Sequence, residues 1–210
     1  MSTSRTPPLR KTLGALPATA TPTTPSVNNV LPVVVIILTL TGVIYKGPAT
    51  AYTGREICFG YNEDSLTIYD VTSKSAPVIL SKTAYKGSSY THQGWLVNSA
   101  MTHLLLDDEL DEQDGTAPNG VAKTTTYLWD ITDLKKPVNT GVYKSQAKSI
   151  DHNLYVNNGI AYMSNYGSGL RVVDVSTMPA NPTGSTMKEI GHFDCYPEDD
   201  AAPVNEFYGE

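Results

Sequence analysis

From residue 56 onwards, the chain alternates between short apolar runs and turn segments rich in Gly, Asn, Asp, Ser and Pro. The apolar runs are enriched in β-branched, aromatic and aliphatic residues, which is typical of strands joined by tight turns. No stretch shows the sustained 3.6-residue periodicity of an amphipathic helix. The pattern predicts three groups of strands, at 57–61, 66–71 and 78–85, then 94–97, 103–107, 124–131 and 138–143, then 154–156, 160–165, 170–175 and 188–193. We therefore expect an all-β protein.

One sequence motif recurs in each group. It is a β-rich run that ends in Asp and is followed by an aliphatic residue and then a hydroxyl residue. The aspartates are Asp70, Asp130 and Asp174, which lie 60 and 44 residues apart, and recurrence at tens of residues indicates a repeat architecture. The runs at 66–71 and 170–175 are bulky on both faces, so their sheets must be covered on both sides, as in a β-propeller. We predict a propeller of about three recognisable four-stranded blades. Because propellers typically have about four to eight blades, we expect this region to be part of a larger ring.

Two local signals predict turns. The carboxylates of Asp70, Asp130 and Asp174 are expected to accept hydrogen bonds from backbone amides about two residues further on, which orders a turn without any metal. Asn158-Gly159 predicts a two-residue hairpin turn, since both residues tolerate positive φ.

The first 45 residues differ from the rest. Residues 1–29 are rich in Ser, Thr and Pro and are predicted to form a disordered leader. Residues 30–45 are almost wholly apolar and carry no charge. We expect buried strands at 33–37 and 43–45, broken at Gly42, because a membrane-spanning helix needs about 20 residues. The alternative is a membrane anchor through 30–45, ahead of a propeller region at 46–210.

The composition of the chain argues against some classes of function. The net charge of −6 argues against a nucleic-acid partner, because phosphate binding needs a basic face. Cys58 and Cys195 are compatible with one disulfide or with two buried thiols, and they do not define a redox compartment. The chain contains no nucleophile-elbow, phosphate-loop or zinc-finger spacing, so no catalytic residue is predicted.

Two histidine–amide pairs are the strongest site candidates. His92-Gln93 and His152-Asn153 are 60 residues apart, each at the start of the first strand of a group. First strands line the channel of a propeller, so both imidazoles are predicted to face a common cavity and to bind a ligand there, such as a divalent metal or an anion. The alternative is a pair of structural histidines that hydrogen-bond to neighbouring backbone.

An acidic run offers a second candidate. The carboxylates of Asp107, Asp108, Glu109, Asp111 and Glu112 offer oxygen ligands that suit Ca²⁺. In a strand, Asp107, Glu109 and Asp111 would share one face. The simpler interpretation is a solvated acidic strand end. A divalent cation, Ca²⁺ or Zn²⁺, is therefore the only cofactor that the sequence suggests.

The repeats resemble the LVIVD-repeat family of β-propellers, and are especially similar to its choice-of-anchor B branch. The resemblance rests on blocks within 45–200, namely Ala51-Tyr-Thr-Gly-Arg-Glu-Ile-Cys-Phe59, Thr91-His-Gln-Gly-Trp-Leu96, Leu105-Leu-Asp-Asp-Glu-Leu-Asp-Glu112, Thr124-Thr-Thr-Tyr-Leu-Trp-Asp130, Ile150-Asp-His-Asn-Leu-Tyr155, Asn165-Tyr-Gly-Ser-Gly-Leu-Arg171 and Tyr196-Pro-Glu-Asp-Asp200. It implies an extracellular or cell-surface propeller without an established reaction. We therefore expect a non-catalytic binding or scaffold module with a protein or carbohydrate ligand. The competing hypothesis is a hydrolase or lyase whose metal is held by His92, His152 and an acidic residue at the channel mouth.

Overall fold

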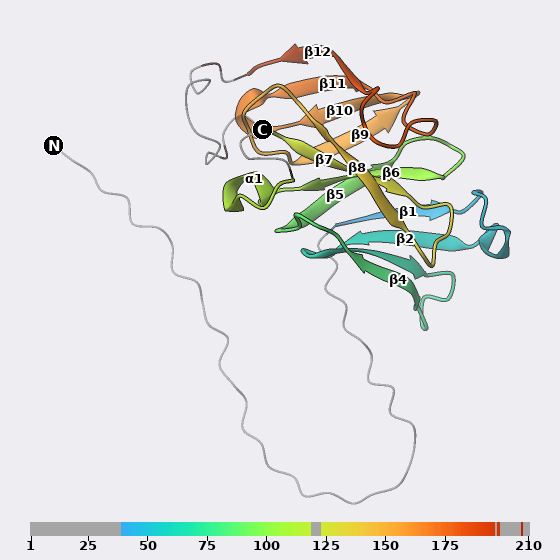
Figure 1. The fold of residues 1–210 in the computed structure, drawn as a ribbon. Helices are drawn as coiled ribbons and strands as arrows, with labels where there is room; N and C mark the ends of the chain where they lie inside the picture. Colours follow the sequence, from blue (N-terminus) through green and yellow to red (C-terminus); the bar gives the residue numbers. More distant parts are fainter. Residues whose placement is uncertain (1–38, 119–122, 196, 198–206, 208–210) are drawn as a thin grey trace, which may run out of the picture. The chain divides into compact units, whose positions relative to one another are not determined.

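The computed structural model describes residues 39–118, 123–195, 197 and 207, and contains three four-stranded antiparallel sheets (Figure 1). The first sheet contains β1 (Thr39–Ile44), β2 (Glu56–Tyr61), β3 (Ser65–Asp70) and β4 (Val78–Ala84). The second contains β5 (Thr91–Leu96), β6 (His103–Asp108), β7 (Thr125–Asp130) and β8 (Val138–Lys144). The third contains β9 (Asn153–Asn157), β10 (Ile160–Ser164), β11 (Leu170–Asp174) and β12 (Lys188–Phe193). Strands that follow one another in the chain are neighbours in each sheet, which confirms the all-β prediction.

Short helical segments occupy three of the connections. They are the 3₁₀ turns η1 (Thr50–Tyr52) and η2 (Tyr166–Ser168), and the single-turn helix α1 (Asp111–Asp114). The helix α1 lies in the connection between β6 and β7, where the chain bears its acidic run.

The beginning of the first sheet corrects one prediction. Gly42 does not break a strand: it lies inside β1 and pairs with Cys58 of β2. The glycine is tolerated because β1 is the edge strand of its sheet, where the missing side chain leaves few contacts unmade. The predicted leader at 1–29 and the predicted strand at 33–37 lie outside the described residues.

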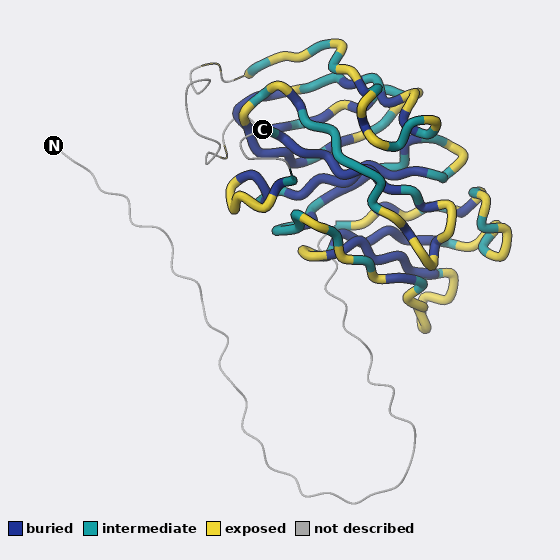
Figure 2. The backbone as a smooth tube through the Cα atoms, in the orientation of Figure 1, coloured by how far each residue is buried: buried dark blue, intermediate teal, exposed yellow. Residues whose placement is uncertain are grey.

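The prediction that the runs at 66–71 and 170–175 are covered on both faces holds for the first only. Every residue of β3 is buried, whereas β11 is mostly half-buried and its Leu170 is 41% exposed. In the second sheet, the central strands β6 and β7 are covered on both faces. Leu104 and Leu106 of β6 pack in a core with the first sheet, against residues such as Phe59 and Ile68. Leu105, on the other face of β6, packs in a core with the third sheet. Figure 2 shows β6 and β7 mostly in the dark blue of buried residues, whereas β8 is mostly intermediate.

The first strands of the three sheets lie next to one another, with β5 against both β1 and β9. The Thr41 hydroxyl of β1 donates to the Gly94 carbonyl of β5 at 2.8 Å. The Gln93 amide of β5 makes two hydrogen bonds to the backbone of Leu154 in β9, donating to its carbonyl at 3.0 Å and accepting from its N–H at 2.9 Å. Side chains thus tie the sheets together along their first strands.

The predicted turns are confirmed. Asp70, Asp130 and Asp174 each accept a hydrogen bond from the backbone N–H two residues on, at 3.0, 2.8 and 2.9 Å. Asn158 and Gly159 both have positive φ, at 50° and 78°, and connect β9 to β10.

The cysteines form neither a disulfide nor a pair of buried thiols. Cys58 is buried in β2, whereas Cys195 is exposed after β12, and the two thiols are not joined. A further finding concerns helices: among the described residues, none is both long and apolar enough to cross a membrane.

Candidate functional site

His92, Glu109 and His152 come together where the second and third sheets meet. The Nδ1 atom of His92 lies 3.4 Å from Oε2 of Glu109, and Nε2 of His152 lies 3.6 Å from its Oε1. One ligand atom from each residue lies within 4.8 Å of the other two. The three side chains are 10 to 18% exposed. We call these residues the histidine–glutamate site.

Local backbone features place the three side chains. His92 sits at a β-bulge, since the register between β5 and β6 slips between Thr91 and Gln93, and bulges re-aim a side chain. Glu109 directly follows β6, and its N–H donates to the carbonyl of Tyr90 at 3.0 Å. His152 directly precedes β9, the strand that Gln93 ties to β5.

The two imidazoles lie against each other. Their ring centroids are 4.6 Å apart and their planes differ by 18°. The Tyr166 ring lies 4.6 Å beyond His152, and its hydroxyl donates to Oε1 of Glu109 at 2.5 Å. The Asn153 amide contacts Nδ1 of His152 at 2.9 Å. The amide and the tyrosine therefore hold the histidine and the carboxylate in place. The Asn153 NH2 group donates to Nδ1 of His152, whereas a histidine that binds a metal through one ring nitrogen donates a hydrogen bond from the other.

The donor set fits a divalent transition metal. Two imidazole nitrogens and one carboxylate are ligands that zinc prefers, at about 2.0–2.2 Å. Tetrahedral ligands at that distance are separated by roughly 3.3 Å. The observed 3.4 and 3.6 Å run to different oxygens of Glu109, and one ligand atom from each of the three residues lies within 4.8 Å of the others. The same distances also suit histidines that simply share a carboxylate. The distances are therefore compatible with two kinds of site: a metal centre, or a network in which the histidines and the glutamate share protons.

The predicted trio Asp107, Glu109 and Asp111 is not brought together on one strand face. The strand β6 ends at Asp108, so Glu109 leaves it toward the histidines, and Asp111 starts α1. The expectation of a solvated strand end is wrong, because Asp107, Asp108 and Asp111 are at most 1% exposed. Burial is possible for Asp108 because it accepts hydrogen bonds from the Ser89 and Tyr90 amides at 2.9 and 2.6 Å.

Instead, four buried carboxyl groups gather between β6, α1, β7 and the start of β9. We call Asp107, Asp111, Glu112 and Asp151 the carboxyl cluster. Tyr127 donates to Oδ2 of Asp111 at 2.6 Å, Thr126 donates to Oδ2 of Asp151 at 3.2 Å, and the Asp151 N–H donates to Oε2 of Glu112 at 3.4 Å. Glu112 belongs to the acidic run that the sequence suggests as a source of Ca²⁺ ligands, whereas Asp151 is not predicted from the sequence. The only signal for Asp151 is its position beside His152 in the chain.

The cluster is electrostatically costly. Burial raises the pKa of all four carboxyls above their ordinary values, and the negative charges of neighbouring carboxyls raise them further. The Lys144 ammonium acts in the opposite sense, since its charge lowers the pKa of Asp111.

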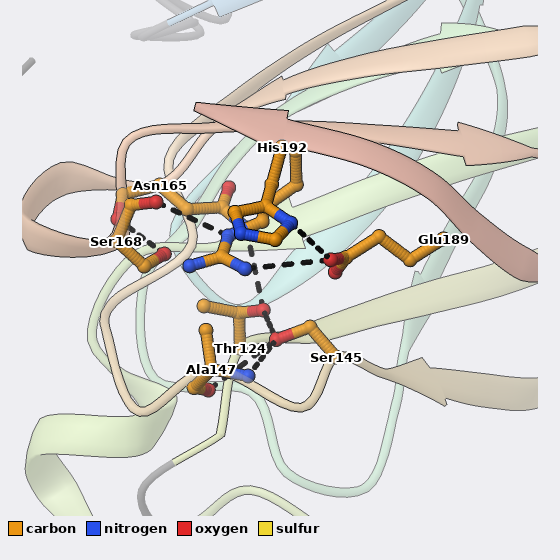
Figure 3. Close-up of polar contacts among 8 residues, drawn as sticks. Thr124, Ser145, Ala147, Asn165, Ser168, Glu189 and His192 are labelled. Atoms are coloured by element: carbon orange, nitrogen blue, oxygen red, sulfur yellow. Dashed lines mark hydrogen bonds and ion pairs between the residues drawn. The ribbon is translucent and has the colours of Figure 1, made fainter. Parts of the chain in front are cut away.

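A polar network supports the connection that carries Asp151 and His152. Figure 3 shows Thr124, Ser145 and Asn165 linked across the second and third sheets, with Thr124 donating to Ser145 at 2.6 Å and Asn165 donating to Thr124 at 3.3 Å. The same view shows Glu189 beside His192, with Nδ1 of His192 3.2 Å from the carboxylate. Within the part of the chain that the structure describes, that pair is not joined by a third metal-type ligand.

No protein-family model and no curated protein sequence matches this chain.

Proposed function

We propose that this protein is a β-propeller binding module that holds a divalent metal ion between its second and third blades. Zinc is the metal whose ligand preference agrees best with the residues there. The observation that carries the proposal is the convergence of His92, Glu109 and His152, with ligand atoms within 4.8 Å of one another. His92 and Glu109 come from one sheet and His152 from the connection to the next. A metal there would fix the junction between two repeats and present a charged centre to a ligand.

The arrangement of the sheets supports a propeller. Each sheet is a four-stranded meander, the sheets pack face to face in chain order, and their first strands lie side by side, as blades do around an axis. The outer face of the third sheet exposes Tyr155, Tyr162 and Phe193, and a further blade would cover such a face. Three blades would then form part of a larger ring.

A location outside the cell or at its surface is part of the proposal, and rests on the resemblance to the LVIVD-repeat family. The proposed ligand is a protein or a carbohydrate. Fusing residues 1–50 to a reporter tests export: a secreted or membrane-attached reporter supports it, and a cytosolic reporter contradicts it.

Zinc titration by calorimetry tests the metal site. We expect the full chain to bind one zinc ion per molecule at the histidine–glutamate site. Replacing His92 by Ala or Glu109 by Gln removes one of three protein ligands, and is expected to weaken binding at least 10-fold. His192→Ala is the matched control, because His192 also lies beside a glutamate but is exposed. Zinc binding that is absent from the wild type, or unchanged in His92→Ala, would contradict the proposal.

A metal-dependent hydrolase or lyase is the second candidate, and one observation favours it. Two histidines and a glutamate are also the ligand set of some catalytic zinc sites, where water takes the fourth position. A panel of ester, amide and phosphoester substrates distinguishes the two. Turnover by the zinc-loaded chain that His152→Ala abolishes and His192→Ala preserves would support the enzyme, whereas zinc binding without turnover supports the binding module.

A further inference from the structure

We infer that a groove at the ends of β5 and β9 binds a neutral oligosaccharide. The groove has a volume of about 500 Å³, and it is lined by the end of β5, the turn after it, the hairpin between β9 and β10 and the segment after β11. Pockets of about 300–1,000 Å³ hold small ligands. The inference rests on the binding-module part of the proposed function and does not depend on the metal. We call this feature the Trp95 groove.

The Trp95 groove is separate from the histidine–glutamate site. His92 lies near the start of β5 and His152 directly precedes β9, whereas Trp95 lies near the far end of β5. Between them, the Gln93 side chain bonds β5 to the backbone of Leu154 in β9. The two ends of the same strand pair therefore carry two different candidate sites.

The first observation is an aromatic side chain in the wall of the groove. Trp95 is half-buried, because it packs partly against the core between the second and third sheets and also lines the groove. The Tyr155 ring meets the indole at 67°, with centroids 4.9 Å apart, and so limits how far the indole can tilt. An indole combines a large apolar face with a polar N–H, and the C–H face of a sugar ring packs well against such a face.

The second observation is a buried acceptor beside the indole. Asn98 lines the groove, and its Oδ1 atom is buried and receives no hydrogen bond from the described residues. Buried carbonyl oxygens are nearly always paired, and an unpaired one costs free energy. A ligand hydroxyl in the groove can supply the donor. Ser99 and Asn158 are exposed on the walls and offer further hydrogen bonds.

The third observation is the absence of charge. Among the described residues that line the groove, none is Asp, Glu, Lys, Arg or His. A charged ligand would lose its hydration there without gaining a counter-charge, and a wholly apolar ligand would leave the polar groups unpaired. A peptide that extends a sheet needs a free strand edge, whereas Gln93 already joins β5 to β9. A neutral sugar, with apolar ring faces and many hydroxyls, agrees best with this lining.

Tryptophan fluorescence of the full chain tests the inference. The chain has two tryptophans and Trp129 is fully buried, so a ligand in the groove changes the emission mainly through Trp95. The probes are neutral tetrasaccharides of glucose, mannose, galactose and N-acetylglucosamine, with a sulfated tetrasaccharide for comparison. We expect a saturable change with at least one neutral probe, and no tighter binding of the sulfated one.

Two variants locate the binding, with affinities measured by calorimetry. Trp95→Ala removes the aromatic wall and is expected to weaken binding of that probe by about 10-fold or more, as loss of a central tryptophan does elsewhere. Asn98→Asp keeps the shape of the side chain but adds a charge, and is expected to weaken binding as well. Phe193→Ala is the control, because Phe193 is an aromatic residue of β12 that is 67% exposed and does not line the groove.

Zinc calorimetry on the same samples separates this inference from the metal proposal. We expect Trp95→Ala and Asn98→Asp to bind zinc as the wild type does, which also shows that they are folded. If Trp95→Ala does not fold, Asn98→Asp decides. A folded wild type that binds none of the neutral probes, or binds them with the affinity of Asn98→Asp, would overturn the inference and leave the zinc proposal standing. Sugar binding by a chain that takes up no zinc would support the groove and contradict the metal.

Discussion

The repeated aspartates show how far one side chain can determine local structure. Asp130 accepts hydrogen bonds from both the amide and the hydroxyl of Thr132, at 2.8 and 2.7 Å, and Asp174 does the same with Ser176 at 2.9 and 2.6 Å. Both partners lie two residues away, so the interaction is fully encoded in the local sequence. This is why the turns could be predicted correctly from the sequence alone.

Asp70 gives a prediction for pH. Hydrogen bonds from Thr72 and from the Arg55 guanidinium lower the pKa of Asp70, although burial opposes them. A carboxyl whose pKa is lower in the folded state stabilises the fold above its unfolded pKa, about 3.9, and this contribution is lost as the pH falls through the folded pKa. We expect Asp70→Asn to lower the free energy of unfolding at pH 7 by about 0.5–1 kcal/mol, the range for a partly exposed ion pair.

The measurement is urea unfolding of both proteins between pH 7 and pH 2. The difference between them is expected to shrink steadily below pH 4. Asp64→Asn is the control, because its carboxylate is 72% exposed and 3.7 Å from its Lys82 partner. A difference that stays constant down to pH 2 would show that the Asp70 charge does not stabilise the fold.

At the scale of the strands, Gln93 links β5 to β9. Its amide pairs with both backbone groups of Leu154, so it joins β5 to β9 as a neighbouring strand would. We expect Gln93→Ala to lower the free energy of unfolding by about 2 kcal/mol, because it leaves buried backbone groups unpaired. It is also expected to weaken zinc binding, since the distance between His92 and His152 depends on this link.

The control for this variant is Gln113→Ala, which removes an exposed glutamine in α1. Stability is measured by urea unfolding and zinc affinity by calorimetry. Loss of stability with unchanged zinc affinity would mean that the histidines are held in place without Gln93.

The ends of elements explain what the sequence analysis missed. The shared face of Asp107, Glu109 and Asp111 assumes that the strand continues, but β6 ends at Asp108 and the chain turns into α1. His92 and His152 are predicted to face a common cavity, and the structure places their rings against each other, with centroids 4.6 Å apart. Their carboxylate partner could not be chosen from the sequence, because its direction depends on where β6 ends and on the bulge in β5. Strand boundaries are the least certain part of any pattern-based prediction.

In the molecule as a whole, the sequence predicts the sheets better than the sites. The strands and their grouping follow from alternation, turn residues and the repeats, all of which act over a few residues. The carboxyl cluster joins residues from Asp107 to Asp151, so it depends on the packing of two sheets and a connection. Its burial could not be inferred from a run of acidic residues, which is usually exposed.

The histidine–glutamate site and the carboxyl cluster lie on the same connections. Glu109 lies between Asp107 and Asp111 in the chain, and His152 follows Asp151. A change that displaces either connection as a whole is therefore expected to affect both groups of side chains.

The most direct test of the metal-binding proposal is an anomalous difference map at the zinc absorption edge, from crystals of the full chain grown with zinc. We predict a peak at about 2.0–2.2 Å from Nδ1 of His92, Nε2 of His152 and a carboxylate oxygen of Glu109. The carboxyl cluster is expected to give no zinc peak. A map without a peak at the histidine–glutamate site, in crystals where zinc occupies other positions, would contradict the proposed function.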